Sequence, residues 1–275
     1  LKGDLSDKSS LLNAVEGVRY VYHLAAILGS SETNLIFRVN HEGTRNLVNI
    51  CLENCDRFER FLFVSSHAVM GPTSGNRIFN EEDDCHPVSD YGKSKLLAEE
   101  YLRSVNGQIP YTIVRLPVVY GPRSLKGFYS AFKLLKNRVH IDFRKGESNV
   151  GFVCDMVEGI IAASTSSKTL GKTYFLGEKR TYSMKELFEA VQKAVGKKAL
   201  KIKIPYFVAY LFAYLSEWYA GINGGHVLLF RHDIKYPHWR MDVSKAEGDF
   251  GFETKTPFDE GIRITADWYR ENGYL

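Results

Sequence analysis

The chain has 275 residues, of which 44% are hydrophobic and 25% are charged, so it can bury a sizeable core and falls in the range of one to two domains. It has 36 Lys and Arg against 32 Asp and Glu, a formal net charge of only +4, and no basic block interleaved with aromatic residues. This composition predicts a soluble globular protein and argues against nucleic acid as a partner.

The cysteines and histidines do not form a metal-binding pattern. The four cysteines, Cys51, Cys55, Cys85 and Cys154, include no C-x-x-C, and the eight histidines include no H-x-x-x-H. We therefore expect no metal site, and we expect small thiols in a reducing compartment. The first residues, "LKGDLSDKSSLL", lack the pattern of a signal peptide, so a cytoplasmic location is the expectation.

Short β-rich runs alternate with helical patterns in the first half of the chain. "VRYVYHLAA" at 18–26 predicts a strand, and the apolar spacing of 34–54 predicts a long helix. Two further buried strands are predicted from "RFLFVSS" at 60–66 and "YTIVRLPVVYGP" at 111–122, with a helix at 89–102 between them. This alternation predicts an α/β fold with a doubly wound parallel sheet and helices on both faces.

Three helical patterns follow in the second half. "GFVCDMVEGIIAA" predicts a helix with Asp155 as its N-cap or as an anion in its first turn. Residues 182–198 predict an amphipathic helix with a capping box formed by Ser183 and Glu186. "DEGIRITADWYRENGYL", at the end of the chain, predicts an amphipathic terminal helix.

The most apolar run is "IPYFVAYLFAYLSEWYAGI" at residues 204–222. Ser216 and Glu217 interrupt it, so it falls short of the ~20 apolar residues that span a bilayer. We expect a helix of the interior or of an interface. Such a helix would suit a lipophilic substrate or contact with a membrane surface, and a helix that covers the core or forms a dimer seam is the alternative.

The ends of the predicted strands are the places to look for a ligand site, because ligands bind outside the carboxyl ends of a doubly wound sheet. The residues there are Leu24, Ala25 and Ala26 after the first strand, Ser65 and Ser66 after the second, and Pro117 and Val118 after the third. Tyr91 and Lys95 stand at i and i+4, on one face of the helix that follows the second strand. We therefore expect Ser66, Tyr91 and Lys95 to converge above one edge of the sheet.

Seven short motifs carry a resemblance that runs through nearly the whole chain. They are "GDLSD" at 3–7, "VYHLAA" at 21–26, "NHEGTRNLV" at 40–48, "FVSSHAVMG" at 63–71, "YGKSK" at 91–95, "RLPVVYGP" at 115–122 and "GFVCDMVEGI" at 151–160. In content and order they resemble the extended short-chain dehydrogenase/reductases, also called the NAD-dependent epimerase/dehydratase family. The resemblance implies a Rossmann-like core, a homodimer and NAD or NADP as cofactor.

The resemblance also implies roles for single residues. Tyr91 resembles the catalytic acid/base, Lys95 its partner, and Ser66 the hydroxyl that holds the substrate oxygen. Cofactor contacts are implied for Asp4, Leu5, Leu24, Ala25, Ala26, Asn40, Ser65, Tyr91, Lys95, Pro117 and Val118. Two of these residues keep a structural alternative, because Ser66 can simply end a strand and Asn40 can simply bond to the backbone.

The chemistry of the residues agrees with these roles. A free tyrosine, with a pKa near 10, is a poor base at neutral pH, and a cation one helical turn away favours its phenolate form. Lys95 would supply that charge and bring the pKa of Tyr91 nearer the working range. Removal of the hydroxyl proton by Tyr91, with Ser66 fixing the oxygen, would then accompany hydride transfer to a nicotinamide.

The glycine-rich turn with which the family begins, G-x-x-G-x-x-G, is missing from the sequence, and only Leu1 and Lys2 precede "GDL". We therefore expect a fragment that lacks the first two strands, roughly 50 to 60 residues in two βα units. Residues 1–122 are assigned to the dinucleotide-binding core. Residues 123–275 are assigned mainly to a smaller α/β substrate-binding region, interleaved with returns to the core.

The substrate is suggested by one departure from the family pattern. Many sugar-nucleotide enzymes of the family have asparagine in "R-x-x-N-V-Y-G-P", where this chain has Val118. With Pro117 and the terminus "WYRENGYL", this resembles the dihydroflavonol reductase and 3β-hydroxysteroid dehydrogenase branch. We expect an NAD(P)-dependent oxidoreductase acting on a secondary alcohol or ketone; the alternatives are a sugar-nucleotide epimerase or dehydratase and a non-catalytic dinucleotide-binding scaffold.

Overall fold

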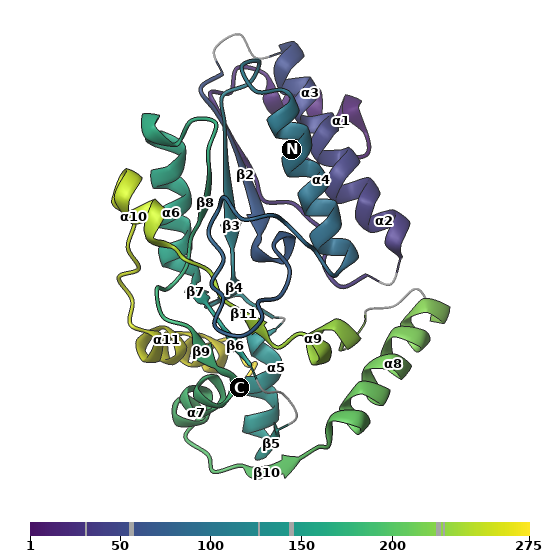
Figure 1. Ribbon diagram of the computed structural model, residues 1–275, viewed down its shortest axis with the longest axis vertical. Coiled ribbons are helices and arrows are strands. Elements are labelled where there is room, and N and C mark those ends of the chain that lie inside the picture. Colours follow the sequence, from purple (N-terminus) through teal and green to yellow (C-terminus); the bar gives the residue numbers. More distant parts are fainter. Residues whose placement is uncertain (31, 55–57, 126, 143–145, 224–226, 228) are drawn as a thin grey trace.

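The centre of the computed structural model is a four-stranded parallel sheet in the order β1-β2-β3-β8 (Figure 1). Its strands are β1 (Tyr20–His23), β2 (Arg60–Ser66), β3 (Tyr111–Leu116) and β8 (Thr173–Phe175). The structure describes residues 1–275 except 31, 55–57, 126, 143–145, 224–226 and 228, so Cys55 lies outside the described residues. Within the described part, β1 pairs with β2 alone and forms an edge of the sheet.

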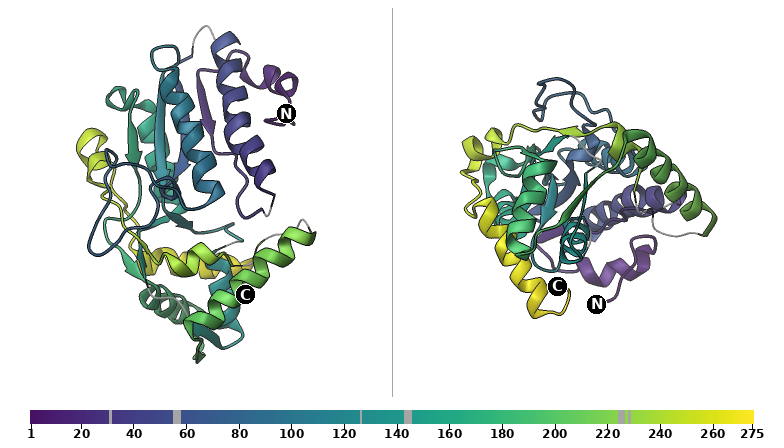
Figure 2. Two further views of the ribbon diagram at one scale, coloured as in Figure 1. Left: turned by 45° about the vertical axis from the view of Figure 1, so that its right-hand side comes forward. Right: turned by 90° about the horizontal axis from the view of Figure 1, so that it is seen from below.

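Helices cover both faces of this sheet (Figures 1 and 2), which confirms the predicted doubly wound α/β fold. One face carries α1 (Lys8–Val15), α3 (Gly43–Asn54) and α4 (Asp90–Ser104), and the other carries α6 (Val153–Thr165) and α10 (Ser244–Phe250). Alternate residues of β2 point to opposite faces, as Phe61 and Phe63 pack toward α3 and α4 while Leu62 packs toward α6. The strand is therefore apolar at its four central positions, 61–64.

Two predicted elements are each divided in the structure. The helix expected at residues 34–54 is α2 (Thr33–Phe37), a π-helical segment η1 (Arg38–Glu42) and α3. The strand expected at 111–122 ends at Leu116, because Pro117 has no N–H to donate to the sheet. The chain resumes as β4 (Val118–Tyr120), which pairs with β7 (Val150–Phe152) in a separate two-stranded sheet.

A second core lies beyond the carboxyl ends of the central strands, among α5 (Phe128–Lys136), α7 (Met184–Val195) and α11 (Phe258–Glu271) (Figure 1). The capping box at the start of α7 is confirmed, since Ser183 and Glu186 bond reciprocally. Asp155 is not an N-cap but lies in the first turn of α6, where it accepts hydrogen bonds from Thr256.

The other short elements are η2 (His67–Val69), η3 (Ser167–Thr169), β5 (Val139–Asp142), β6 (Glu147–Ser148), β9 (Tyr182–Ser183), β10 (Leu200–Lys203) and β11 (His238–Trp239).

The apolar run at residues 204–222 forms α8 (Tyr206–Asn223), at the margin of the molecule next to α9 (Arg231–Lys235) (Figure 2). Its buried residues are the small ones, Ala209, Ala213 and Ala220, while its large apolar side chains are exposed. The prediction of an interior helix is therefore wrong, and an interface is the interpretation that remains. Among the described residues, no helix is long and apolar enough to cross a membrane.

Candidate active site

Tyr91 and Ser66 meet where α4 begins beside the carboxyl end of β2. Ser89 caps α4 by accepting a hydrogen bond from the backbone N–H of Gly92 at 3.1 Å, which fixes Tyr91 in the first turn. The side chains of Tyr91 and Ser66 share a hydrogen bond. The Ser66 hydroxyl also accepts from the backbone N–H of Ala68 at 3.2 Å, so it has a defined position at the strand end.

Gly92 allows α4 to approach the segment after β2 closely. A Cβ at this position would lie 2.5 Å from the carbonyl oxygen of Ala68, a distance that real Cβ atoms do not reach. The glycine of "YGKSK" is therefore required by packing between α4 and η2. This contact holds the first turn of α4, and with it Tyr91, against the end of β2.

Lys95 is buried, with 1% of its surface exposed, and its ammonium is directed at β2. The Nζ atom donates a hydrogen bond to the carbonyl oxygen of Val64 at 2.6 Å and lies 4.0 Å from the centroid of the Phe63 ring. Burial lowers the pKa of Lys95 to about 7, and the nearby Glu99 carboxylate opposes this shift. Lys95 thus titrates near neutral pH.

The pKa of Tyr91 differs from the sequence expectation. Burial raises the pKa of Tyr91 above its ordinary value, and the hydrogen bond with Ser66 offsets this rise only in part. The predicted lowering by Lys95 is not found in this arrangement, because the ammonium is engaged by Val64 and Phe63 and its own charge is weakened by burial. The hydroxyl of Ser66 therefore favours the phenolate here, and burial opposes it.

Asn40 is buried in η1 and clamps the chain that follows β1. Its Oδ1 accepts from the backbone N–H of Ile27 at 2.7 Å, and its Nδ2 donates to the carbonyl oxygen of Ile27 at 3.0 Å. The same Nδ2 donates to Ser94 Oγ at 3.1 Å, and Ser94 in turn donates to the carbonyl oxygen of Tyr91 at 2.8 Å. Asn40 therefore bonds to the backbone, as its structural alternative predicts, and joins the end of β1 to the Tyr91 helix.

The other predicted cofactor contacts differ in exposure. Leu24, Ala25, Ala26 and Val118 are exposed, whereas Ser65 and Pro117 are buried. Ser65 faces Glu99, whose pKa its hydroxyl helps to lower. The small residues Ala25 and Ala26 are exposed and precede Ile27, which Asn40 holds, so their backbone is open to a flat ligand.

Asp4 and Leu5 lie at the start of the chain beside α3. The Oδ1 atom of Asp4 accepts from the backbone N–H of Ser6 at 2.8 Å, and Asn46 Nδ2 donates to the carbonyl oxygen of Leu5 at 3.0 Å. Asp4 is exposed and Leu5 is half-buried. These contacts fix the turn before α1, and no contact between it and Tyr91 or Lys95 is found among the described residues.

Sequence reasoning missed a buried ion pair behind the site. Arg115 donates to Glu99 from Nε at 3.1 Å and from a terminal nitrogen at 2.7 Å, and both side chains are almost fully buried. Arg103 donates to the same carboxylate at 2.7 Å. Arg115 stands in the quoted motif "RLPVVYGP" and Glu99 one turn after Lys95, so their motifs were recognised but their pairing was not.

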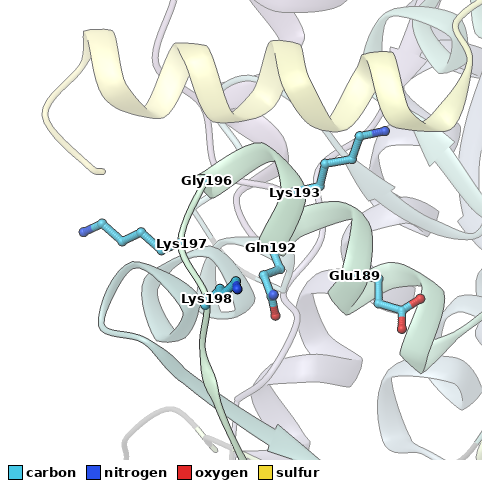
Figure 3. Close-up of a pocket in the computed structure, with 6 residues that line it drawn as sticks. All are labelled: Glu189, Gln192, Lys193, Gly196, Lys197 and Lys198. Carbon is cyan, nitrogen blue, oxygen red and sulfur yellow. The ribbon is translucent and has the colours of Figure 1, made fainter.

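A surface hollow of about 280 Å³ lies elsewhere, at the carboxyl end of α7 (Figure 3). It is lined by Glu189, Gln192, Lys193, Gly196, Lys197 and Lys198, and the side chains of Lys193 and Lys197 point in different directions. None of the predicted catalytic or cofactor residues lines it. The chemistry of the chain is therefore to be sought at the strand ends rather than at this hollow.

Comparison with known proteins gives a family match over most of the chain. The model described as the NAD dependent epimerase/dehydratase family matches residues 1–177. A 4-epimerase of N-acetyl-alpha-D-glucosaminyl-diphospho-ditrans,octacis-undecaprenol from Escherichia coli O157:H7 is 29% identical over 81% of this chain and 68% of its own length. A 3beta-hydroxysteroid-dehydrogenase/decarboxylase (isoform 2) from Arabidopsis thaliana is 25% identical over 97% of this chain and 51% of its own length.

A solved structure with the same fold is UDP-glucuronic acid 4-epimerase from Bacillus cereus in complex with NAD. It superposes with a TM-score of 0.76 over 98% of this chain and 78% of its own length, at 23% identity. At this identity the similarity establishes the Rossmann-like fold and says nothing of the substrate. The match covers both the central sheet and the helices beyond its strand ends.

Proposed function

The chain belongs to the NAD-dependent epimerase/dehydratase family, and we propose that it transfers a hydride between NAD and a secondary-alcohol carbon of a small-molecule substrate. The observation that carries this proposal is the hydrogen bond between Tyr91 and Ser66, with Lys95 one helical turn away. The phenol and the serine hydroxyl can contact the same substrate oxygen. Tyr91 would then take or return its proton while Ser66 fixes its position.

The residues at the strand ends fit one half of the cofactor. The exposed backbone of residues 24–26 offers a flat surface, and the Lys95 ammonium, which spends one donor on the carbonyl oxygen of Val64, keeps two further N–H donors that a ribose hydroxyl could accept. The glycine-rich turn that receives the diphosphate in this family does not occur in the sequence. Bound there, NAD would supply the hydride acceptor and donor; the protein positions the alcohol and handles its proton.

The first version of this proposal is a transient oxidation, in which the same substrate takes the hydride back after epimerisation or elimination. The relative of higher identity, the 4-epimerase from E. coli, acts by its name on a diphosphate-linked sugar. Because of this relative, we rank the epimerase or dehydratase version above the net dehydrogenase that the sequence motifs alone predict. It also widens the substrate class from sugar nucleotides to sugars on a lipid diphosphate.

The second version is a net dehydrogenase of a lipophilic alcohol or ketone. Val118 favours the dehydrogenase version. The side chain of Val118 has no amide that could donate to a diphosphate, and 42% of the surface of the residue is exposed. The relative from A. thaliana, a hydroxysteroid dehydrogenase by name, also fits this version. In that case the nicotinamide is released and replaced in each cycle.

The experiment that tests the proposal follows the hydride. The intact protein is incubated with UDP- and dTDP-sugars and with a polyprenyl-diphosphate-linked N-acetylhexosamine, and products are separated by chromatography. In parallel, the absorbance of reduced nicotinamide is followed with a panel of ketones. New sugar product without net absorbance change supports the first version, and stoichiometric absorbance change supports the second. Neither signal, or a signal that persists unchanged in Tyr91→Phe, overturns the proposal.

A further inference from the structure

Helix α8 exposes its large apolar side chains and buries its small ones, the opposite of a helix that packs on a globular core. Ala209, Ala213 and Ala220 are the buried residues of the helix, and Ala209 and Ala213 pack with Ile234 of α9. The large apolar residues face the opposite direction and are between 40% and 70% exposed: Phe207, Val208, Leu211, Phe212, Tyr214, Leu215, Trp218, Tyr219 and Ile222. We call this set the outer face of α8.

The outer face is continuous along the helix. Phe207, Leu211, Tyr214, Trp218 and Ile222 follow the spacing of three or four residues that places side chains on one side of an α-helix. Such a contiguous exposed apolar surface is rare on a protein that is surrounded only by water, and it marks a site of protein or membrane contact. Tryptophan and tyrosine are also the residues that concentrate at the boundary between lipid and water.

The charges around α8 distinguish between these partners. Six Lys or Arg and two acidic residues occur between positions 197 and 235, and two of the six are paired, Lys201 with Asp142 and Arg231 with Glu217. The single acidic residue of α8, Glu217, is bridged by Arg231 at 2.6 Å, so its charge is compensated. Lys203 is exposed at the end of β10, two residues before the helix begins, and Lys235 lies beside the first turns of the helix, near Tyr206 and Tyr210.

An apolar face flanked by positive charge is complementary to an anionic lipid surface and not to a second copy of itself. In a symmetric dimer through α8, the lysines around each helix would approach the same lysines of the partner and repel them. A bilayer containing anionic lipids attracts them instead, while the aromatic side chains enter the interface. Since α8 is not a spanning helix, it would lie in the plane of the surface.

We propose that α8 docks this protein on the surface of an anionic phospholipid bilayer, with the outer face inserted at the interface and Lys203 and Lys235 toward the headgroups. Figures 1 and 2 show α8 at the margin of the molecule, beyond the carboxyl ends of the central strands. Docking therefore places lipid on the side of the molecule that carries Ser66, Tyr91 and Lys95 rather than behind the sheet. The proposal stands whichever version of the proposed function holds.

The test is flotation of the purified chain with vesicles of phosphatidylcholine mixed with phosphatidylglycerol, compared with phosphatidylcholine alone. The wild type is expected to float with the anionic vesicles, and less so as salt rises. The double variant Phe207→Ser and Trp218→Ser is expected to bind the vesicles at least about tenfold more weakly than the wild type. Lys203→Glu with Lys235→Glu is expected to weaken binding about fivefold or more per residue.

The matched control is Leu170→Ser, because Leu170 is an apolar residue of similar exposure (51%) outside α8. It should float like the wild type. All substituted side chains are at the surface, and circular dichroism checks that each variant is folded. Absence of flotation, or flotation that the α8 variants leave unchanged, overturns the proposal. So does a dimer in light scattering that the α8 double variant abolishes, because the outer face would then bind a second copy.

Discussion

The ammonium of Lys95 lies 2.6 Å from the carbonyl oxygen of Val64. The buried lysine of α4 therefore bonds to β2, the strand that ends at Ser66. The Phe63 ring, 4.0 Å from the same nitrogen, covers it from the core side. A carbonyl and a ring face replace part of the hydration of the ammonium without supplying a full negative charge. This explains why burial lowers the pKa of Lys95 to about 7.

The first prediction is a pH dependence of stability that Lys95 causes. In the folded protein its pKa is about 7, against 10.5 in an open chain. Below pH 7 both states are charged and the cost of burial is fully present. Between about pH 7 and 10.5 the unfolded chain binds more protons, so the stability of the folded protein rises with pH, by at most about 1.4 kcal/mol per pH unit.

Lys95→Met removes this contribution. The difference in the free energy of unfolding between wild type and variant, measured by urea denaturation from pH 6 to pH 9, should therefore shift in favour of the wild type as the pH rises. Lys93→Met, which alters an exposed lysine of the same helix, is the control. Parallel curves for wild type and Lys95→Met would contradict the assigned pKa.

The second prediction concerns the buried carboxylate of Glu99. Burial alone would raise the pKa of Glu99, but Arg115 and Arg103 lower it and keep it ionised. Glu99→Gln leaves the Arg115 guanidinium buried without its counter-charge, which is expected to cost about 3–5 kcal/mol of unfolding free energy. Glu100→Gln, at the next and exposed position, should change it little. Near-equal denaturation midpoints for the two variants would refute this account of the ion pair.

The sequence predicted the fold because its strands carry strong local signals. Residues 61–64 are apolar at successive positions, and the structure forms β2 over the predicted range 60–66. The interruption of the next strand at Pro117 also follows from a local rule, because proline has no backbone N–H to donate to a sheet. Periodicity did not reveal that η1 is a π-helical segment, since its five residues are too few to establish a separate period within the apolar pattern.

The details of the site depended on contacts that no motif contains. The spacing of Tyr91 and Lys95 predicts a shared helix face, but the direction of the ammonium is set by the Val64 carbonyl, which belongs to another element. The pKa of Tyr91 is raised because burial outweighs the hydrogen bond with Ser66. The same limit applies to α8, where composition indicates an apolar helix and only packing shows which of its faces is exposed.

The third prediction is that Asn40 positions the segment after β1. Asn40→Ala removes both hydrogen bonds to Ile27 and the one to Ser94, leaving polar groups unsatisfied in a buried place. The expected loss of unfolding free energy is about 1–3 kcal/mol. Hydrogen exchange at the amide of Ile27 should also become faster, which a loss confined to the helix would not cause. Asn54→Ala, at an exposed position of α3, serves as control.

The last prediction separates a catalytic tyrosine from a structural one. Tyr91→Phe removes only the hydroxyl that shares a hydrogen bond with Ser66, so the ring still packs and the fold is retained. If the hydroxyl transfers the substrate proton, turnover of the intact protein falls on the order of 10²-fold or more, while the dissociation constant for NAD in calorimetric titration changes little. Tyr101→Phe is the matched control, because Tyr101 also lies in α4 and its hydroxyl donates to Asn49. A rate for Tyr91→Phe equal to that of Tyr101→Phe would show that the Tyr91 hydroxyl has no part in the chemistry, and that the hydrogen bond with Ser66 is a feature of packing alone.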